Sequence, residues 1–297
     1  MPSARSDSES PAHRRVATVT ARVDGDGPAE SVPPWTVPAS WDLQRCRPAA
    51  AGRWAVHWVE TTTSTNDELV RQAEGRADRS VLVADLQTAG RGRLGRTWQA
   101  PRGTALTFSV LLRPDPVPPS RRGWVGALLG LAVTSAIARR TGLSADLKWP
   151  NDVLIDGHKA AGILAEMTPT ALVVGAGVNV SIGAADLPRS DATSLLLAGA
   201  DPDVCGREEL LAATLDELAP LLDRWVAGGG DADRSGIRAD YRVRCSTLGR
   251  RVRLELPSAD PVTGTAVDVD ADGSIVIDDG IAVRRFAAGD VQHLRDA

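Results

Sequence analysis

A glycine- and arginine-rich run between two apolar segments most constrains what this chain can fold into. Residues 90–103, GRGRLGRTWQAPRG, separate the apolar segments 80–86 and 104–112, whose length and composition predict buried strands. The run contains G-x-G-x-x-G, a fingerprint of dinucleotide-binding loops that requires a helix to open at its third glycine. Here Pro101 and another predicted strand follow instead, so the sequence argues against a Rossmann fold.

The arginines of this run indicate a different chemistry. Arg91, Arg93, Arg96 and Arg102 can donate charge-assisted hydrogen bonds, and the glycines let backbone N–H groups approach an anion closely. A planar guanidinium fits both carboxylate and phosphate with two hydrogen bonds. Four neighbouring cations repel one another, and a bound anion would relieve that repulsion. We therefore predict an anion-handling loop; an exposed basic turn without a ligand is the alternative.

A second candidate segment follows downstream, KWPND at 148–152. The Pro-Asn pair breaks the strand, so Asn151 and Asp152 are expected at a bend where their side chains can reach a site. Lys159 lies in the next predicted strand, within an otherwise apolar sequence. Such a lysine either points to solvent from an edge strand or is a cation placed in a site. The nearby arginine loop favours the second interpretation.

Two further segments carry polar groups beside apolar elements. GAGVNV at 175–180 ends a predicted strand; its glycines permit close approach of a flat ring, and Asn179 offers a donor and an acceptor. Residues 64–66, Ser-Thr-Asn, precede a helix, with Thr65 to Glu68 fitting a capping box. A glycine-kinked core strand and simple helix capping are the alternatives. Gln87 is a weaker candidate of the same kind.

The remaining pattern predicts an α+β chain with a small β-barrel appended. Helical spacing covers 123–140, ending before Gly142, and 208–226, which contains Pro220. Strands are expected at 145–149, 152–155, 158–167 and 171–180, with an Asp156-Gly157 hairpin turn. From residue 248, short alternating segments separated by Pro, Asp and Gly indicate the barrel.

Composition excludes several classes of protein. Of 297 residues, 43% are hydrophobic and 24% charged, ordinary for a globular protein, and the net charge of −4 does not indicate nucleic-acid binding. The three cysteines form no CxxC pair, the four histidines show no metal spacing, and no signal peptide or membrane span is visible. We expect a cytoplasmic protein. Residues 1–45 are expected to be a disordered extension, unable to form a winged helix.

Together, GRGRLGRTW, KWPND with its KAAGIL continuation, and GAGVNV resemble the motifs of the biotin–protein ligases, in that family's order and spacing, over residues 54–295. The resemblance implies a mixed α/β catalytic domain at 50–246 with a seven-stranded sheet, and a C-terminal SH3-like β-barrel at 247–297. It implies two reactions: biotin and MgATP give biotinyl-5′-AMP, and a lysine of a biotin carboxyl carrier domain, part of an acyl-CoA carboxylase, then displaces AMP.

The resemblance also implies roles for the candidate residues. The implied biotin contacts are Ser64, Thr65, Asn66, Gln87, Arg91, Gly92, Arg93, Lys159 and Gly162. The implied contacts to ATP and the adenylate are Arg93, Arg96, Trp98, Asn151, Lys159 and Asn179. Arg93 and Lys159 would neutralise charge at phosphorus, and Asp152 is a candidate for orienting the incoming amine. Arg295 corresponds, within one residue, to a C-terminal arginine associated with ATP.

Two alternatives of different kinds stay open at this point. A lipoate–protein ligase or lipoyl/octanoyl transferase shares the catalytic fold, although the arginine loop, KWPND and the C-terminal barrel favour biotin. A non-catalytic sensor of biotin or nucleotide is the other alternative; the presence of every expected phosphate-facing group argues against it. We expect a monomer or weak homodimer that binds neither nucleic acid nor membrane. The sequence does not indicate which residues would bind a metal ion.

Overall fold

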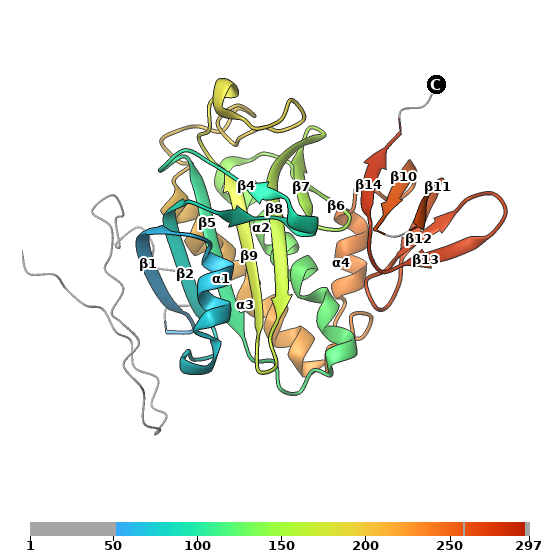
Figure 1. The fold of residues 1–297 in the computed structure, drawn as a ribbon, viewed down its shortest axis with the longest axis horizontal. Helices are drawn as coiled ribbons and strands as arrows, with labels where there is room; N and C mark the ends of the chain where they lie inside the picture. The colour runs from blue at the N-terminus through green and yellow to red at the C-terminus, as the bar shows by residue number, and fades with distance from the viewer. Residues whose placement is uncertain (1–51, 258, 295–297) are drawn as a thin grey trace, which may run out of the picture.

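The computed structural model describes residues 52–257 and 259–294. The predictions for the N-terminal extension and for Arg295 therefore lie outside the described residues. Two sheets lie side by side, a seven-stranded mixed sheet covered by helices and a smaller antiparallel sheet built from the C-terminal segment (Figure 1). This confirms the predicted fold class. Within the described residues, no helix is long and apolar enough to cross a membrane.

The seven-stranded sheet has the order β1-β2-β5-β9-β8-β7-β6. Its strands are β1 (Ala55–Thr62), β2 (Ser80–Gln87), β5 (Ala105–Leu112), β6 (Asp146–Lys148), β7 (Asp152–Ile155), β8 (His158–Met167) and β9 (Leu172–Asn179). Only β1 and β2 pair in parallel; the other pairs are antiparallel. Every residue of β5 and β9 is buried, because helices cover both faces of the sheet.

The helices form one layer on each face of this sheet (Figure 1). The short helix α1 (Thr65–Arg71) packs against β5 and β9 on one face, whereas α2 (Val125–Thr141) and α3 (Arg207–Ala227) cover the other. As predicted, α2 ends at Gly142, which adopts a left-handed conformation with φ 73°. A further helix, α4 (Ile237–Arg244), was not predicted, because it is short and buries only Ile237 and Tyr241.

The predicted capping box is displaced by one residue. Ser64, not Thr65, is the N-cap of α1, and its hydroxyl accepts a hydrogen bond from the backbone N–H of Asp67 at 3.4 Å. The hydroxyl of Thr65 is engaged by Gln87 and Ser109 instead. Thr65 therefore faces into the molecule, and a sequence pattern for capping could not distinguish the two positions.

The hairpin between β7 and β8 turns at the predicted dipeptide. Asp156 and Gly157 both have positive φ, 49° and 79°, as a two-residue turn that matches strand twist requires. This turn sets Lys159 opposite Leu154 and places it on β8 beside the KWPND bend.

The C-terminal sheet contains β10 (Arg251–Leu256), β11 (Ala259–Val269), β12 (Ile275–Asp278), β13 (Val283–Phe286) and β14 (Asp290–His293). All pairs are antiparallel, in the order β13-β12-β11-β10-β14. Among the described residues the edge strands β13 and β14 do not pair, so the sheet does not close into a barrel. The alternating segments were predicted as strands; β14 was not.

Candidate active site

A cavity of about 520 Å³ lies on the α1 face of the large sheet, beneath the arginine loop. This loop contains β3 (Gly90–Arg91), which pairs with β4 (Thr97–Trp98), and it crosses in front of β8 and β9 (Figure 1). No α-helix follows Gly95, as predicted. All predicted site residues within the described range line this cavity: Ser64, Thr65, Asn66, Gln87, Arg91, Gly92, Arg93, Arg96, Trp98, Asn151, Asp152, Lys159, Gly162 and Asn179.

One end of the cavity is a buried network of neutral groups around Ser109. The Ser109 hydroxyl lies 2.7 Å from Thr65 Oγ1 and 2.6 Å from Asn66 Oδ1. Gln87 Oε1 accepts from the Thr65 backbone N–H at 2.8 Å. Ser109 is fully buried, and sequence analysis missed it because a serine in the middle of an apolar strand carries no signal of its own.

This network continues to β8 through the Asn66 amide. Its Nδ2 donates to the Leu164 carbonyl at 3.1 Å and to Glu166 Oε2 at 2.9 Å. A Cβ added at Gly175 would lie 2.3 Å from Asn66 Oδ1 and 2.6 Å from Ser109 Oγ. Only glycine at this position allows the asparagine to reach the sheet, so the network is fixed before any ligand arrives.

The glycines of β8 and β9 do accommodate a flat ring, and one such ring belongs to the protein. A Cβ at Gly177 would lie 2.3 Å from Trp98 Cε2, and one at Gly162 would lie 3.3 Å from Trp98 Cζ3. The Trp98 indole therefore lies against the sheet surface. Its buried Nε1 has no hydrogen-bond partner within the described part of the chain, which leaves a donor at the cavity wall.

Most loop arginines are paired with carboxylates of the protein. Arg91 pairs with Asp67 and, at 2.6 Å, with Glu166; Arg96 pairs with Asp290. Arg102 does not line the cavity and instead contacts Glu60 and Asp85, 3.2 and 3.3 Å away. Distant carboxylates, which the local sequence does not include, therefore already relieve much of the repulsion that a bound anion was expected to relieve.

Arg93 is the exception. Its guanidinium forms no ion pair with any residue of 52–257 or 259–294; Nη1 reaches only Asn151 Oδ1 and the Gly289 carbonyl, both at 3.4 Å. Partial burial lowers its pKa below the usual value, and the negative charges of Asp290 and Asp152 offset this only in part. A half-buried arginine without an ion-pair partner is the strongest candidate in the loop for binding an anion.

Lys159 points into the cavity rather than to solvent from an edge strand. Its Nζ lies 2.6 Å from Asp152 Oδ1, and about a quarter of its side chain is exposed. Asn151 Nδ2 donates to the Ile163 carbonyl at 2.9 Å, which holds the KWPND bend against β8. Asn179 Nδ2 donates to the Thr193 carbonyl, also at 2.9 Å.

The C-terminal sheet reaches the same cavity through β14, which sequence analysis did not anticipate. Burial alone would raise the pKa of Asp290, but the hydrogen bond from Arg96 and the positive charges of Arg96, Lys148 and Arg93 together lower that pKa. On the same strand, His293 Nε2 lies 3.1 Å from Thr247 Oγ1, which accepts from the Trp149 backbone N–H. Burial lowers the pKa of His293 to about 4 and keeps this imidazole neutral near pH 7.

The cavity therefore joins a buried end of hydroxyl and amide groups, bordered by the Arg91–Glu166 ion pair, to a charged end with two aspartates, Asp152 and Asp290. No cluster of three or more His, Cys, Asp or Glu side chains suited to a metal ion occurs among the described residues. The cavity lining contains no cysteine or histidine that could act as a nucleophile or base. Such an arrangement suits the binding of a polar ring at one end and the stabilisation of phosphate charge at the other.

Comparison with known proteins gives a consistent picture. Residues 56–182 match the biotin/lipoate A/B protein ligase family, and residues 247–294 match the C-terminal domain of biotin protein ligases. The chain is 40% identical to a biotin–[acetyl-CoA-carboxylase] ligase of Mycobacterium tuberculosis, over 83% of this chain and 92% of that protein. It is 33% identical to the corresponding ligase of Paracoccus denitrificans, over 73% and 91% of the two chains.

Solved structures agree. A biotin protein ligase from Aquifex aeolicus in complex with biotin and ATP superimposes with a TM-score of 0.67 at 28% identity. The match covers 81% of this chain and 99% of that one.

Proposed function

Since the chain belongs to the biotin protein ligase family, we propose that it attaches biotin to a lysine of a biotin carboxyl carrier domain through a biotinyl-5′-AMP intermediate. One observation carries the proposal: a single cavity joins the buried network around Ser109 to the cations Arg93 and Lys159. Biotin has a neutral polar ring at one end and a carboxylate at the other, which ATP activates. It therefore requires an uncharged hydrogen-bonding site and a cationic site within the length of one biotin molecule.

We assign the buried end to the ureido and ring region of biotin. Ser64, Thr65, Asn66 and Gln87 offer donors and acceptors there without a net charge, which matches a neutral ureido group. Gly162 lies beside Lys159 and Trp98, and it leaves room for the chain that leads to the carboxylate. We assign Arg91 and Gly92 to the rim of this end.

In the first reaction, a biotin carboxylate oxygen bonds to the α-phosphorus of ATP while the bond to the β-phosphate bridging oxygen breaks. Pyrophosphate leaves with that electron pair. Negative charge grows on the α-phosphate oxygens, where Arg93 and Lys159 would stabilise it. Arg96, Trp98, Asn151 and Asn179 are assigned to holding the adenylate. Mg²⁺ would enter with ATP as part of the substrate; two carboxylates in the cavity, Asp152 and Asp290, suit its preference for oxygen ligands.

In the second reaction, the neutral lysine amine attacks the adenylate carbonyl carbon, AMP leaves with the electrons of the C–O bond, and the nitrogen releases a proton. We assign Asp152 to orienting the amine, since its carboxylate is paired with Lys159, the cation that we assign to the activated carboxylate. ATP supplies the activation, so no serine or cysteine nucleophile is needed.

Several finer points belong to the same proposal. We place the boundary between the catalytic and C-terminal domains at residues 246–247, the carrier in an acyl-CoA carboxylase, and the reaction in the cytoplasm. We also propose that the chain acts as a monomer or weak homodimer that binds neither nucleic acid nor membrane.

The test is transfer of labelled biotin, with ATP, to a purified carrier domain. We expect the parent chain to incorporate labelled biotin into the carrier domain and the Arg93→Ala variant to lose this activity. Parallel reactions contain lipoate in place of biotin. Labelling with lipoate and not with biotin would support the lipoate-ligase alternative, and tight binding of biotin without pyrophosphate release would support a sensor.

A further inference from the structure

A second cavity, about 410 Å³, lies where the large sheet meets the C-terminal sheet. It is lined by α2, the KWPND bend, α4 and the turn between β11 and β12. Its walls include the aromatic rings of Trp124, Trp149 and Tyr241. The roles assigned above to the first cavity do not use it.

The two cavities meet at the edge of β8. The pairing of β8 with β7 stops at Gly162. Gly162 lines the first cavity, Ala165 lines the second, and Ile163 lines both. Neighbouring residues of a strand point to opposite faces, so the cavities lie on opposite sides of this edge. Between them stand Asn151, bonded to the Ile163 backbone, and Arg93.

Of the two residues that separate the cavities, Arg93 is held by the weaker hydrogen bonds. Its two hydrogen bonds are both 3.4 Å long, beyond the usual range, whereas Asn151 and Ile163 exchange two bonds of 2.9 Å. A phosphate bound in the first cavity would draw the Arg93 guanidinium towards it. The bound nucleotide would then move the Arg93 side chain away from its place between the two cavities.

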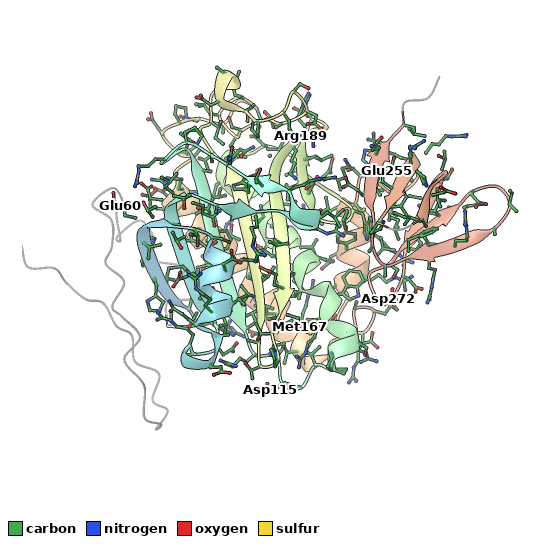
Figure 2. The ribbon with its side chains drawn as sticks, viewed as in Figure 1. Glu60, Asp115, Met167, Arg189, Glu255 and Asp272 are labelled. Carbon is green, nitrogen blue, oxygen red and sulfur yellow. The ribbon has the colours of Figure 1, made fainter. Side chains whose placement is uncertain are left out.

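A carboxylate that no cation of the described residues contacts directly lines the second cavity; burial would raise its pKa, but hydrogen bonds from Ser274 and the charge of Arg285 lower it. Asp272 is exposed, and within the described ranges it forms no ion pair; its Oδ1 accepts from the Ser274 backbone N–H at 2.9 Å. Its turn is held in place by two indoles: Trp124 Nε1 donates to the Ala271 carbonyl at 2.7 Å and Trp149 Nε1 to the Gly273 carbonyl at 3.0 Å. Figure 2 shows Asp272 where the helices meet the C-terminal sheet.

We propose that this second cavity is the entrance for the acceptor lysine, with Asp272 attracting its ammonium group and the aromatic walls packing against its methylene chain. The inference rests on the proposed function. In that reaction the adenylate occupies the first cavity, and the second cavity offers the amine a separate approach to Arg93 and Asn151, which line both. A long cationic side chain matches a carboxylate and aromatic walls, whereas a nucleotide phosphate would be repelled by Asp272.

The test separates the two reactions of the chain. Adenylate formation is measured by the release of pyrophosphate, with hydroxylamine present to react with the adenylate. Hydroxylamine is neutral near pH 7. Transfer is measured separately, with the carrier domain as acceptor. Asp272→Asn is expected to raise the KM for the carrier about two- to fivefold, the size typical of one exposed charge contact. Asp272→Glu should restore it.

Asp278→Asn is the matched control. Asp278 is also exposed and also accepts a backbone N–H two residues onward, from Gly280, but it lies outside the cavity. If Asp272→Asn left the KM for the carrier unchanged, or raised the KM for ATP, the lysine entrance would be overturned while the proposed function would stand. A parent chain that formed no biotinyl-adenylate would overturn the proposed function and this inference together.

Discussion

The two ends of the first cavity are built from different interactions. At the end around Ser109, buried hydroxyl and amide groups hydrogen-bond to one another, and most belong to α1 and β5. At the other end, side chains that are partly exposed form ion pairs, and these come from the arginine loop, the KWPND bend and β14.

This difference indicates different tasks. A buried network with its partners already in place loses little freedom when a ligand binds, so it suits recognition of one shape. Exposed ion pairs are individually weak and can exchange one anion for another. The charged end can therefore release Arg96 from Asp290, or Lys159 from Asp152, when phosphate arrives, and the neutral end stays unchanged.

The largest effect is expected at the charged end, from Arg93→Ala. Loss of a positive group that faces the developing phosphate charge should reduce the rate of pyrophosphate release about 10²- to 10³-fold. Arg102→Ala, in the same loop, should leave the rate close to that of the parent, because Arg102 lies outside the cavity and Asp85 keeps its ion pair with Arg207. Equal losses in the two variants would mean that the loop acts only through its total charge.

A smaller effect is expected at the neutral end, from Ser109→Ala. Losing one buried hydrogen bond at the ring site should raise the KM for biotin about tenfold and leave that for ATP unchanged. Thr107→Val is the matched control: Thr107 lies two residues earlier on β5 and donates to the Ala84 carbonyl at 2.8 Å, outside this cavity. Both variants should lower the melting temperature. A biotin KM raised equally in both would assign the effect to stability instead of recognition.

The smallest effect is that of salt. Between about 0.1 and 1 M salt the Debye length falls from about 10 to 3 Å, which weakens interactions between exposed charges. The KM for ATP should rise a few-fold over this range, whereas calorimetric affinity for biotinamide, which lacks the carboxylate, should change little. If both changed together, the two ends would not differ as the structure indicates.

Much of the site could be predicted because its chemistry is concentrated in short segments. The absence of a helix after Gly95 argued against the dinucleotide fold, and the arginine loop near Lys159 favoured a cation in a site over an edge lysine; the structure agrees with both. Ser109 and Asp290 could not be predicted from their neighbours. A serine inside a strand, or an aspartate at the start of one, has the same local pattern whether it faces a cavity or solvent.

The sequence by itself determined most of the elements, the large and the small sheet and the set of groups that can bind phosphate, since these depend on local periodicity and residue type; α4 and β14 emerged only in the structure. Only the tertiary structure decided which arginine of the loop has no ion-pair partner among the described residues. Arg96 finds Asp290 across nearly two hundred residues, and Arg91 finds Glu166 on β8. The Arg96–Asp290 pair depends on how the small sheet packs beside the large one, through Trp124 and Trp149, and no local pattern encodes that distance.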